Sequence, residues 1–276
     1  MTLRVAVITP ASGNRLAHLH RQRRFLHDAG GDGIEMVRIE AWLDADDPSG
    51  FDGAECVHVP PGRYGLRVGA ARNAAAAEAL ALGADLLVFL DVDCLPAPGL
   101  LQRYAEAARS RPDGLLCGPV TYLHSVQRPR DPDDLAGLTR PHPGRPNPAA
   151  GEIVTAMPTQ FDLFWSLSFA VTPSTWARLG GFDERYEGYG AEDTDLGRRA
   201  RECGIPLLWV GGAHAYHQWH PAGTPPWRHL DDILRNGALF AARWGEWPMR
   251  GWIDEFVRAG AVEEHEGGFR RTATAP

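Results

Sequence analysis

The sequence predicts an α/β fold, with one domain built on a mostly parallel central sheet that helices flank. Apolar runs rich in β-branched residues or leucine, 3–9, 33–39 and 85–90, are typical of buried strands. Helical patterns over 16–26 and 70–82 separate these runs. Strands that alternate with helices in this way form parallel sheets. With 276 residues, the chain is long enough to bury a large core without disulfides or metal ions.

Local signals mark the ends of the first elements. The strand 3–9 ends at Pro10, and leucines recur at helical spacing over 16–26. After the third strand, the pattern predicts a helix over 99–109 and a strand over 114–122.

Prolines interrupt the regular pattern between residues 128 and 149. We expect a long surface loop here, and two interpretations stay open: a disordered insertion, or a mobile flap over a substrate site. Beyond it, we expect a strand over 165–171, helices over 173–179 and 192–202, and a strand over 207–210. The tryptophan-rich C-terminal part predicts one or two amphipathic helices that cover the sheet.

Composition excludes several classes of chemistry. The formal net charge is −7, and all 28 basic residues are arginine. Without lysine the chain cannot form a Schiff base with pyridoxal phosphate or use a Walker A lysine. The acidic balance argues against a nucleic-acid partner. The 4 cysteines lack metal-ligand spacing, which predicts reduced thiols in a cytoplasmic protein, and no apolar run is long enough to predict an integral membrane segment.

Two aspartates, Asp91 and Asp93, directly follow the strand 85–90. Open parallel sheets bind ligands at the carboxyl ends of their strands. Carboxylates at positions i and i+2 there can hold a divalent cation that neutralises a diphosphate. A strand-end turn with two solvated aspartates would look the same, so this motif alone leaves both interpretations open.

A second cluster of acidic residues lies among glycines between Gly181 and Asp195. Glu192 and Asp193 stand where a helix should begin, and the helix dipole favours negative charge there. Helix capping accounts for one or two of these acids, but not for the whole cluster beside the aromatic Tyr189. We therefore expect a ligand site.

Three histidines, His214, His217 and His220, follow the strand 207–210. One of these imidazoles could complete a mixed oxygen and nitrogen metal site with the aspartates. The spacing leaves open which of the three would bind.

In this order the motifs resemble those of the GT-A glycosyltransferases, most closely the branch that joins family 2 enzymes, including bacterial chondroitin-polymerase-type domains, to the β-1,4-galactosyltransferases. FLDVDCLP (89–96) looks like the family's metal motif, and GGFDERYEGYGAEDTDLGRRAR (180–201) like its acceptor and catalytic motif. AYHQ (215–218) looks like its metal-histidine segment. The resemblance covers roughly residues 5–220 and implies the Rossmann-like GT-A fold.

The resemblance also implies how the chain is divided. A single GT-A domain would span 1–263, followed by a flexible tail over 264–276. Within the domain it implies a nucleotide-sugar half (1–122), the Pro-rich loop (123–160), an acceptor and catalytic half (161–222) and C-terminal helices (223–263).

For the metal, the resemblance makes Asp93 the direct ligand and Asp91 a contact to the donor ribose or to metal-bound water. His217 is the implied imidazole ligand, with His214 as the second choice. The implied cofactor is Mn²⁺ or Mg²⁺.

For the acceptor, the resemblance makes Asp193 the general base that deprotonates a hydroxyl, with Glu192 orienting the acceptor. Tyr189 takes the place of the aromatic residue that stacks on the acceptor. Asp183 and Trp165 lie near these motifs in sequence and are further candidates for acceptor binding.

For the donor, the resemblance implies contacts near the ends of the first two strands, from Thr9, Pro10, Ala11, Asn14, Arg15 and Glu40, and a further contact from Arg67. Glu40 would accept the N3–H of a uracil, a role for which Asp44 competes. With no lysine in the chain, arginine is the natural partner of the phosphates.

Together these roles imply an inverting, metal-dependent transfer of a sugar from a nucleoside diphosphate sugar, with a UDP-sugar expected, to an acceptor hydroxyl. The acceptor could be a glycan, a lipid-linked sugar, a peptide or a natural product. One alternative is a sugar-1-phosphate nucleotidyltransferase, which would need a glycine-rich, basic segment where this chain has residues 10–15. The other is a non-catalytic module that binds a nucleotide sugar or glycan.

Overall fold

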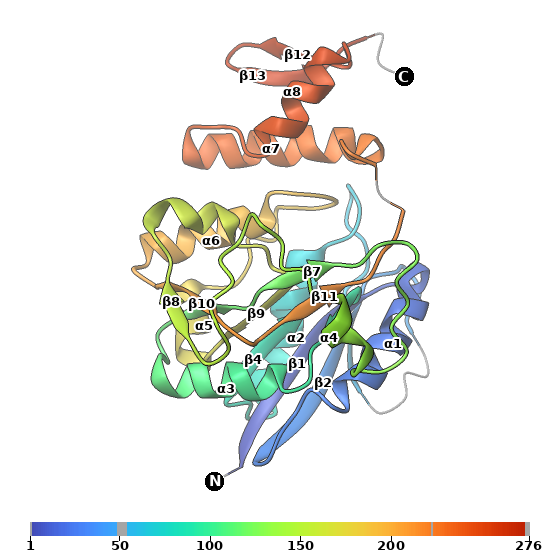
Figure 1. Cartoon of the computed structure of the whole chain (residues 1–276). Helices are drawn as coiled ribbons and strands as arrows, with labels where there is room; N and C mark the ends of the chain where they lie inside the picture. Colours follow the sequence, from blue (N-terminus) through green and yellow to red (C-terminus); the bar gives the residue numbers. More distant parts are fainter. Residues whose placement is uncertain (1, 49–53, 222, 274–276) are drawn as a thin grey trace.

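The computed structural model describes residues 2–48, 54–221 and 223–273, and its centre is a mixed β-sheet (Figure 1). The strands of this sheet are β1 (Leu3–Ala11), β2 (Ile34–Trp42), β3 (Glu55–His58), β4 (Leu86–Leu90), β6 (Leu115–Cys117), β8 (Ile153–Thr155), β9 (Ser168–Val171) and β10 (Leu207–Val210). Within the described residues they lie in the order β3-β2-β1-β4-β9-β6-β10-β8. The first four strands are parallel, as is the β6–β10 pair, whereas β9 and β8 are antiparallel to their neighbours. The predicted mostly parallel sheet is confirmed.

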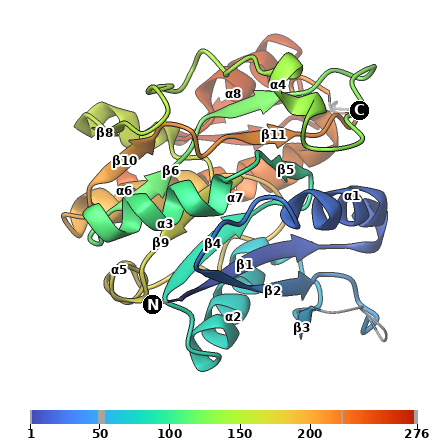
Figure 2. The same ribbon diagram turned by 60° about the horizontal axis from the view of Figure 1, so that its bottom comes forward.

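Helices cover both faces of the sheet (Figure 2). They are α1 (Leu16–Leu26) and α3 (Leu100–Ser110) on one face, and α2 (Val68–Ala81), α5 (Pro173–Leu179) and α6 (Glu192–Glu202) on the other. Alternation along β1 produces this arrangement, because Val5 and Val7 enter the core under α1 and α3 while Ala6 and Ile8 pack under α2. The predicted bounds of α1, α5, α6 and β10 match the structure.

A small second sheet crosses the carboxyl-terminal edge of the main one. Its order is β5-β11-β7, with β5 at Cys94–Pro96, β7 at Val120–Tyr122 and β11 at Ala215–His217. The single strand expected over 114–122 is therefore two strands in different sheets. Gly118 makes this change of sheet possible, because a Cβ there would collide with the carbonyl oxygen of Ala213.

The Pro-rich segment is more regular than expected. It contains the short helix α4 (Asp134–Leu138) and the strand β8, which pairs antiparallel with β10. The 3₁₀ helix η2 (Pro158–Leu163) then leads into the next part of the core. The expectation of a long irregular loop over 128–149 is thus wrong at α4. The expected loop over 123–160 also contains β8, which is an outer strand of the main sheet.

The C-terminal elements do not cover the sheet, which corrects the expectation from sequence. They are α7 (Leu230–Trp244), α8 (Arg250–Arg258), β12 (Val262–His265) and β13 (Gly268–Arg271). Instead, α7 packs against α6 and the loop before it: Phe240 contacts Tyr186 and Ala191, and Trp244 Nε1 donates to Asp195 at 2.9 Å.

The predicted flexible tail over 264–276 is also corrected. β12 and β13 form an antiparallel hairpin, and Val262 belongs to a small apolar cluster with Ile253 and Phe256 of α8. Residues 274–276 lie outside the described residues. None of the helices in the described part of the chain is long and apolar enough to cross a membrane.

Candidate active site

The candidate site lies where the carboxyl ends of β1 and β4 meet. These strands are neighbours, but the chain leaves β1 toward β2 on its other side, so the strand order reverses between them. Such a reversal opens a crevice in which α/β sheets bind ligands. Buried Gln22 joins the two strand ends, since it accepts from Thr9 Oγ1 at 3.1 Å and donates to the carbonyl oxygen of Asp91 at 2.6 Å.

A carboxylate and two imidazoles converge beside this crevice. Among the described residues, Asp93, His217 and His220 form a group whose ligand atoms all lie within 4.8 Å of one another. The Asp93 carboxylate is 3.6 Å from His217 Nε2 and 3.4 Å from His220 Nε2. This mixed donor set fits a first-row transition ion such as Mn²⁺ better than Mg²⁺, which prefers oxygen ligands.

The local charges keep Asp93 ionised, as a metal ligand must be. Burial by itself would raise the pKa of this carboxyl. The neighbouring His217, His220 and Arg15 outweigh burial and lower the pKa of Asp93 to about 2.

Two expected metal ligands lie outside this group. His214 is buried and hydrogen-bonds through Nε2 to Thr121 Oγ1 at 2.8 Å, and burial lowers its pKa to about 4. Asp91 Oδ1 instead accepts from Arg72 Nη2 at 2.6 Å. The structure therefore places His220, rather than His214, beside His217, and gives Asp91 an arginine partner.

One buried arginine connects the two acidic motifs. The Arg72 side chain is 2% exposed, and its Nη1 lies 3.4 Å from Glu192 Oε1 while its Nη2 binds Asp91. Its guanidinium also lies over the ring of Phe182, 5.0 Å from the centroid. The motifs in the sequence did not single out Arg72, although a lone arginine within the alanine-rich 70–82 helix is a usable signal.

Asp193 lies in the first turn of α6, and its environment suits a general base. Burial and the adjacent charge of Glu192 raise the pKa of Asp193 to about 7. Its Oδ1 accepts hydrogen bonds from the backbone N of Thr194 at 2.7 Å and from Thr194 Oγ1 at 3.3 Å. A general base works best when its pKa is near the operating pH.

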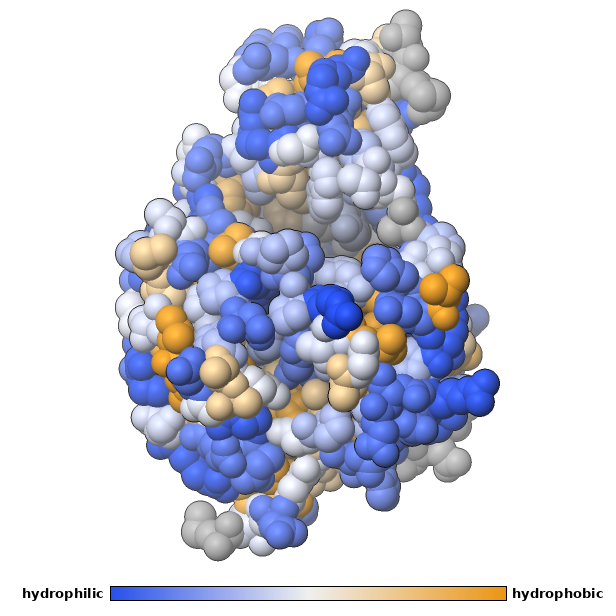
Figure 3. Space-filling model, viewed as in Figure 1, coloured by the Kyte–Doolittle hydropathy of each residue, from blue (hydrophilic) through white to orange (hydrophobic). Residues whose placement is uncertain are grey.

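Tyr189 is the one expected acceptor residue that lies near these acids. Burial, together with the charges of Glu192 and Asp193, raises the pKa of Tyr189 to about 12. Tyr189 is 38% exposed, and its ring stacks on that of His229, with centroids 4.5 Å apart and planes 15° apart. This contact joins the main body to the C-terminal elements, and Figure 3 shows a hollow between these two parts.

The other two expected acceptor residues have different surroundings. Asp183 pairs with Arg185 at 2.6 Å, and this contact lowers the pKa of the Asp183 carboxyl. Trp165 packs against the Pro-rich segment, with its ring 5.0 Å from that of His142 and 5.2 Å from the Arg145 guanidinium.

The expected donor contacts divide into buried and accessible residues. Thr9, Pro10 and Ala11 are buried at the end of β1. Asn14 and Arg15 line a pocket beside α1. Arg67 precedes α2 and lies 3.4 Å from Glu184.

Glu40 is not placed as a uracil contact should be. It is 3% exposed, and its two oxygens accept from Arg23 at 2.8 and 2.5 Å. The competing candidate Asp44 follows β2 and accepts from the backbone N of Gly13 at 2.6 Å.

The chain is similar in sequence to proteins named as glycosyltransferases. A family profile described as the N-terminal domain of galactosyltransferase matches residues 155–220, which include α6 and two histidines of the metal group. Validoxylamine A glucosyltransferase of Streptomyces hygroscopicus subsp. jinggangensis is 31% identical over 162 residues, 52% of this chain and 37% of that protein. N-acetylglucosaminyl-diphospho-decaprenol L-rhamnosyltransferase of Mycobacterium tuberculosis is 35% identical over 85 residues, 29% of this chain and 27% of that protein. The chain thus spans only about a third of the length of these relatives.

Solved structures agree on the fold. S. aureus TarS superposes with a TM-score of 0.57 at 13% identity, over 92% of this chain and 43% of that chain. GalNAc-T7, solved with UDP, GalNAc and Mn²⁺, superposes with a TM-score of 0.54 at 13% identity, over 88% of this chain and 50% of that chain. The predicted GT-A fold is confirmed, and the relatives support a glycosyltransferase.

Proposed function

We propose that this GT-A-fold chain, which resembles glycosyltransferases, transfers a sugar from a nucleoside diphosphate sugar to an acceptor hydroxyl with inversion. One observation carries the proposal: the group Asp93, His217 and His220 and the carboxyl of Asp193 belong to one connected site. Arg72 connects them by binding both Asp91 and Glu192. We take the donor to be a UDP-sugar, which is consistent with the UDP and Mn²⁺ bound in the GalNAc-T7 structure.

The donor side of the site has the residues that a divalent cation would need. Asp93, His217 and His220 would hold Mn²⁺, and the bound ion would neutralise the charge of the leaving diphosphate. Arg72 holds Asp91 in place, so that the free carboxylate oxygen of Asp91 is available to the donor ribose or to bound water.

The acceptor side provides a base and an aromatic surface. Asp193 would accept the proton of the acceptor hydroxyl as the new glycosidic bond forms, which requires an approach to within about 3 Å. With a pKa of about 7, this carboxyl is partly ionised at neutral pH and can also release the proton again. Glu192, fixed by Arg72, would orient the hydroxyl, and Tyr189 offers a ring on which a sugar can stack.

On this proposal, 1–122 supplies the donor contacts and 161–222 the acceptor contacts. The acceptor is defined only as a hydroxyl of a glycan, lipid-linked sugar, peptide or natural product. The two relatives described above are named as glycosyltransferases, which favours transfer over the nucleotidyltransferase and binding-module alternatives.

A thermal-shift panel tests the donor site. UDP, GDP, TDP, CDP and ADP are each added with and without Mn²⁺, to the native protein and to Asp93→Asn. A nucleotide at 100 times its Kd adds about 2.7 kcal/mol of stability. We expect one nucleotide, UDP, to raise the midpoint by several degrees with Mn²⁺ in the native protein alone; no response to any nucleotide would contradict the proposal.

A further inference from the structure

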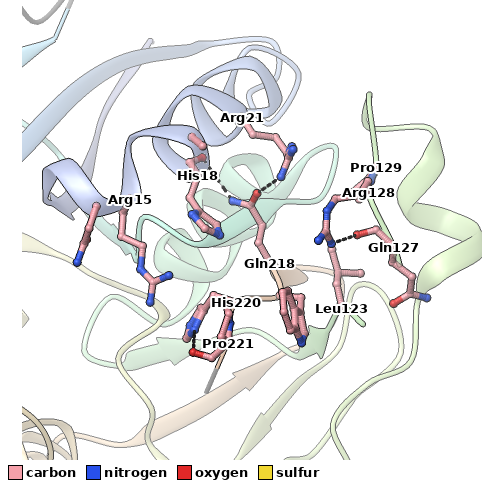
Figure 4. A pocket seen from close by; sticks show the side chains of 13 residues that line it. Arg15, His18, Arg21, Leu123, Gln127, Arg128, Pro129, Gln218, His220 and Pro221 are labelled. Carbon is pink, nitrogen blue, oxygen red and sulfur yellow. Dashed lines mark hydrogen bonds between the residues drawn. The ribbon is translucent and has the colours of Figure 1, made fainter. Parts of the chain in front are cut away.

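The two imidazoles of the metal group are fixed in different ways. Metal-binding histidines usually have their second ring nitrogen fixed by a carboxylate, a carbonyl or water. His220 has such a contact, since its Nδ1 lies 3.4 Å from the carbonyl oxygen of Pro221 (Figure 4). In the part of the chain that the structure describes, neither ring nitrogen of His217 has a hydrogen-bond partner, and its Nε2 lies 3.6 Å from Asp93 Oδ1. The orientation of the His217 ring therefore depends on packing.

Tyr122 supplies that packing. The rings of Tyr122 and His217 are stacked, with centroids 4.6 Å apart and planes 24° apart. The register of the small sheet causes this contact, because Tyr122 of β7 is paired with His217 of β11 and paired side chains lie on the same face of a sheet. Tyr122 is 44% exposed, so a substitution there removes the contact without opening the core.

His142 of the Pro-rich segment holds the Tyr122 ring in turn. The two rings meet edge to face, with centroids 5.6 Å apart and planes 62° apart. The backbone N of His142 donates to the carbonyl oxygen of Val120 at 2.8 Å, and its Nδ1 accepts from the backbone N of Gly144 at 3.1 Å. Trp165 meets the other side of this contact, with its ring centroid 5.0 Å from that of His142. A continuous row of rings thus runs from the metal group through the Pro-rich segment.

We propose that Tyr122 is a positioning residue, which holds the His217 imidazole in the orientation that binds the cation, and that His142 supports Tyr122. A ring that is already held in place loses less freedom when the ion binds, which strengthens binding. The inference rests on the proposed metal group and extends it, because neither residue is itself a ligand. It gives the Pro-rich segment a supporting role at the metal group, in place of a disordered insertion or a mobile flap.

Mn²⁺ alone tests this role, without knowledge of the nucleotide, the sugar or the acceptor. Its Kd is measured by calorimetry for the native protein, Tyr122→Leu, Tyr122→Phe and Tyr64→Leu. Tyr122→Leu removes the stacked ring and should raise the Kd about tenfold, whereas Tyr122→Phe keeps the ring and should retain the native Kd. Tyr64→Leu is the matched control and should also retain it. Tyr64 has a similar exposure of 48%, but its ring contacts Arg63 and Arg235 instead of the metal group.

A double-mutant cycle tests the support from His142. His142→Ala should raise the Mn²⁺ Kd about threefold, because Tyr122 keeps its place on His217 but loses one edge contact. Combined with Tyr122→Leu, the same change should have no further effect, since the ring through which His142 acts is already gone. A role in stability alone would not produce this dependence.

Urea unfolding in EDTA establishes that each variant is folded, and if Tyr122→Leu is not, His142→Ala is compared with Tyr64→Leu instead. Equal Kd values in that comparison, a Tyr122→Phe variant as weak as Tyr122→Leu, or no Mn²⁺ binding by the native protein would overturn the inference. Failure of the proposed function alone would appear differently. The native protein would still bind Mn²⁺ but would transfer no sugar, and the comparison of the tyrosine variants would be unaltered.

Discussion

The Asn236 side-chain amide donates to the backbone carbonyl of Tyr189 at 3.1 Å, so helix α7 holds the acceptor loop in place. The same nitrogen also lies 3.0 Å from the carbonyl oxygen of Glu187 and 3.1 Å from that of Gly190. Asn236 is 1% exposed, so water cannot replace these contacts. The C-terminal elements thus support the loop that carries the proposed acceptor residues.

Replacing Asn236 with Leu should loosen that loop. The change keeps the branched shape of the side chain but removes the donor, and a buried carbonyl left without a partner costs about 1–3 kcal/mol. We expect urea unfolding to show a loss of this size and the KM for the acceptor to rise, while nucleotide affinity stays unchanged. Ala238→Ser, at an exposed position of the same helix, should change neither quantity; an unaltered acceptor KM in Asn236→Leu would show that the loop does not depend on α7.

Substituting the histidines singly should identify the metal ligands. His220→Asn removes a ligand atom from the group with Asp93, so we expect Mn²⁺ affinity, measured by calorimetry, to fall at least about tenfold. His214→Gln serves as the control, because His214 contacts Thr121 and lies outside that group. Equal losses in the two variants would contradict the proposed ligand set.

Asp193 should control the pH dependence of transfer. The base acts as a carboxylate, so kcat/KM should rise with pH up to about 7 and then level off. Asp193→Asn should lower turnover by about 10²–10⁴-fold and abolish that rise, with nucleotide affinity retained. Asp183→Asn, which removes a carboxylate paired with the exposed Arg185, should keep the native profile, and an unchanged profile in Asp193→Asn would remove Asp193 from the reaction.

The same carboxyl should make folding pH-dependent with an unusual sign. The folded pKa of Asp193 is about 7, above its ordinary value of 3.8, so the folded state binds the proton more tightly than the unfolded state does. Its contribution to stability is therefore present below pH 4 and lost as the pH rises toward 7. Asp193→Asn should be more stable than the native protein at pH 8 by about 1–4 kcal/mol, and this difference should vanish at pH 4. Chemical unfolding at both pH values measures it.

Glu40 should matter for stability and not for donor selection. Glu40→Gln removes the charge that accepts from Arg23 inside the protein, which should cost about 1–3 kcal/mol in urea unfolding. Glu35→Gln is the control on the same strand, because its pair with Arg4 is exposed to solvent and should contribute little to stability. A changed nucleotide preference in Glu40→Gln would restore Glu40 as a base contact.

Sequence patterns predicted the elements whose signals are local. The helices at 16–26, 173–179 and 192–202 have periodic apolar residues and clear stops, and the structure has the same bounds. The three- and four-residue strands β3, β5 and β11 went unrecognised, because pairing with distant strands, rather than any period of their own, forms them.

The site residues that the sequence predicted also have local signals, and those that it missed depend on contacts between distant segments. Asp93, His217 and Asp193 stand out because each follows or opens a regular element. The choice between His214 and His220 needed the tertiary structure, because His214 lies just before β11, where it is buried against Thr121, whereas His220 lies beside His217 and Asp93. Arg72 acts across the fold on Glu192, 120 positions away in sequence, and no local pattern reports such a contact.

The pairing of β8 with β10 predicts what deletion of the Pro-rich segment would do to the main sheet. Removing this segment would leave the backbone groups along one side of β10 (Leu207–Val210) without hydrogen-bond partners. Every side chain of β10 is apolar. An uncovered, apolar outer strand pairs readily with its counterpart in another molecule and promotes aggregation. By pairing with β10, the short strand β8 therefore also protects the chain from self-association.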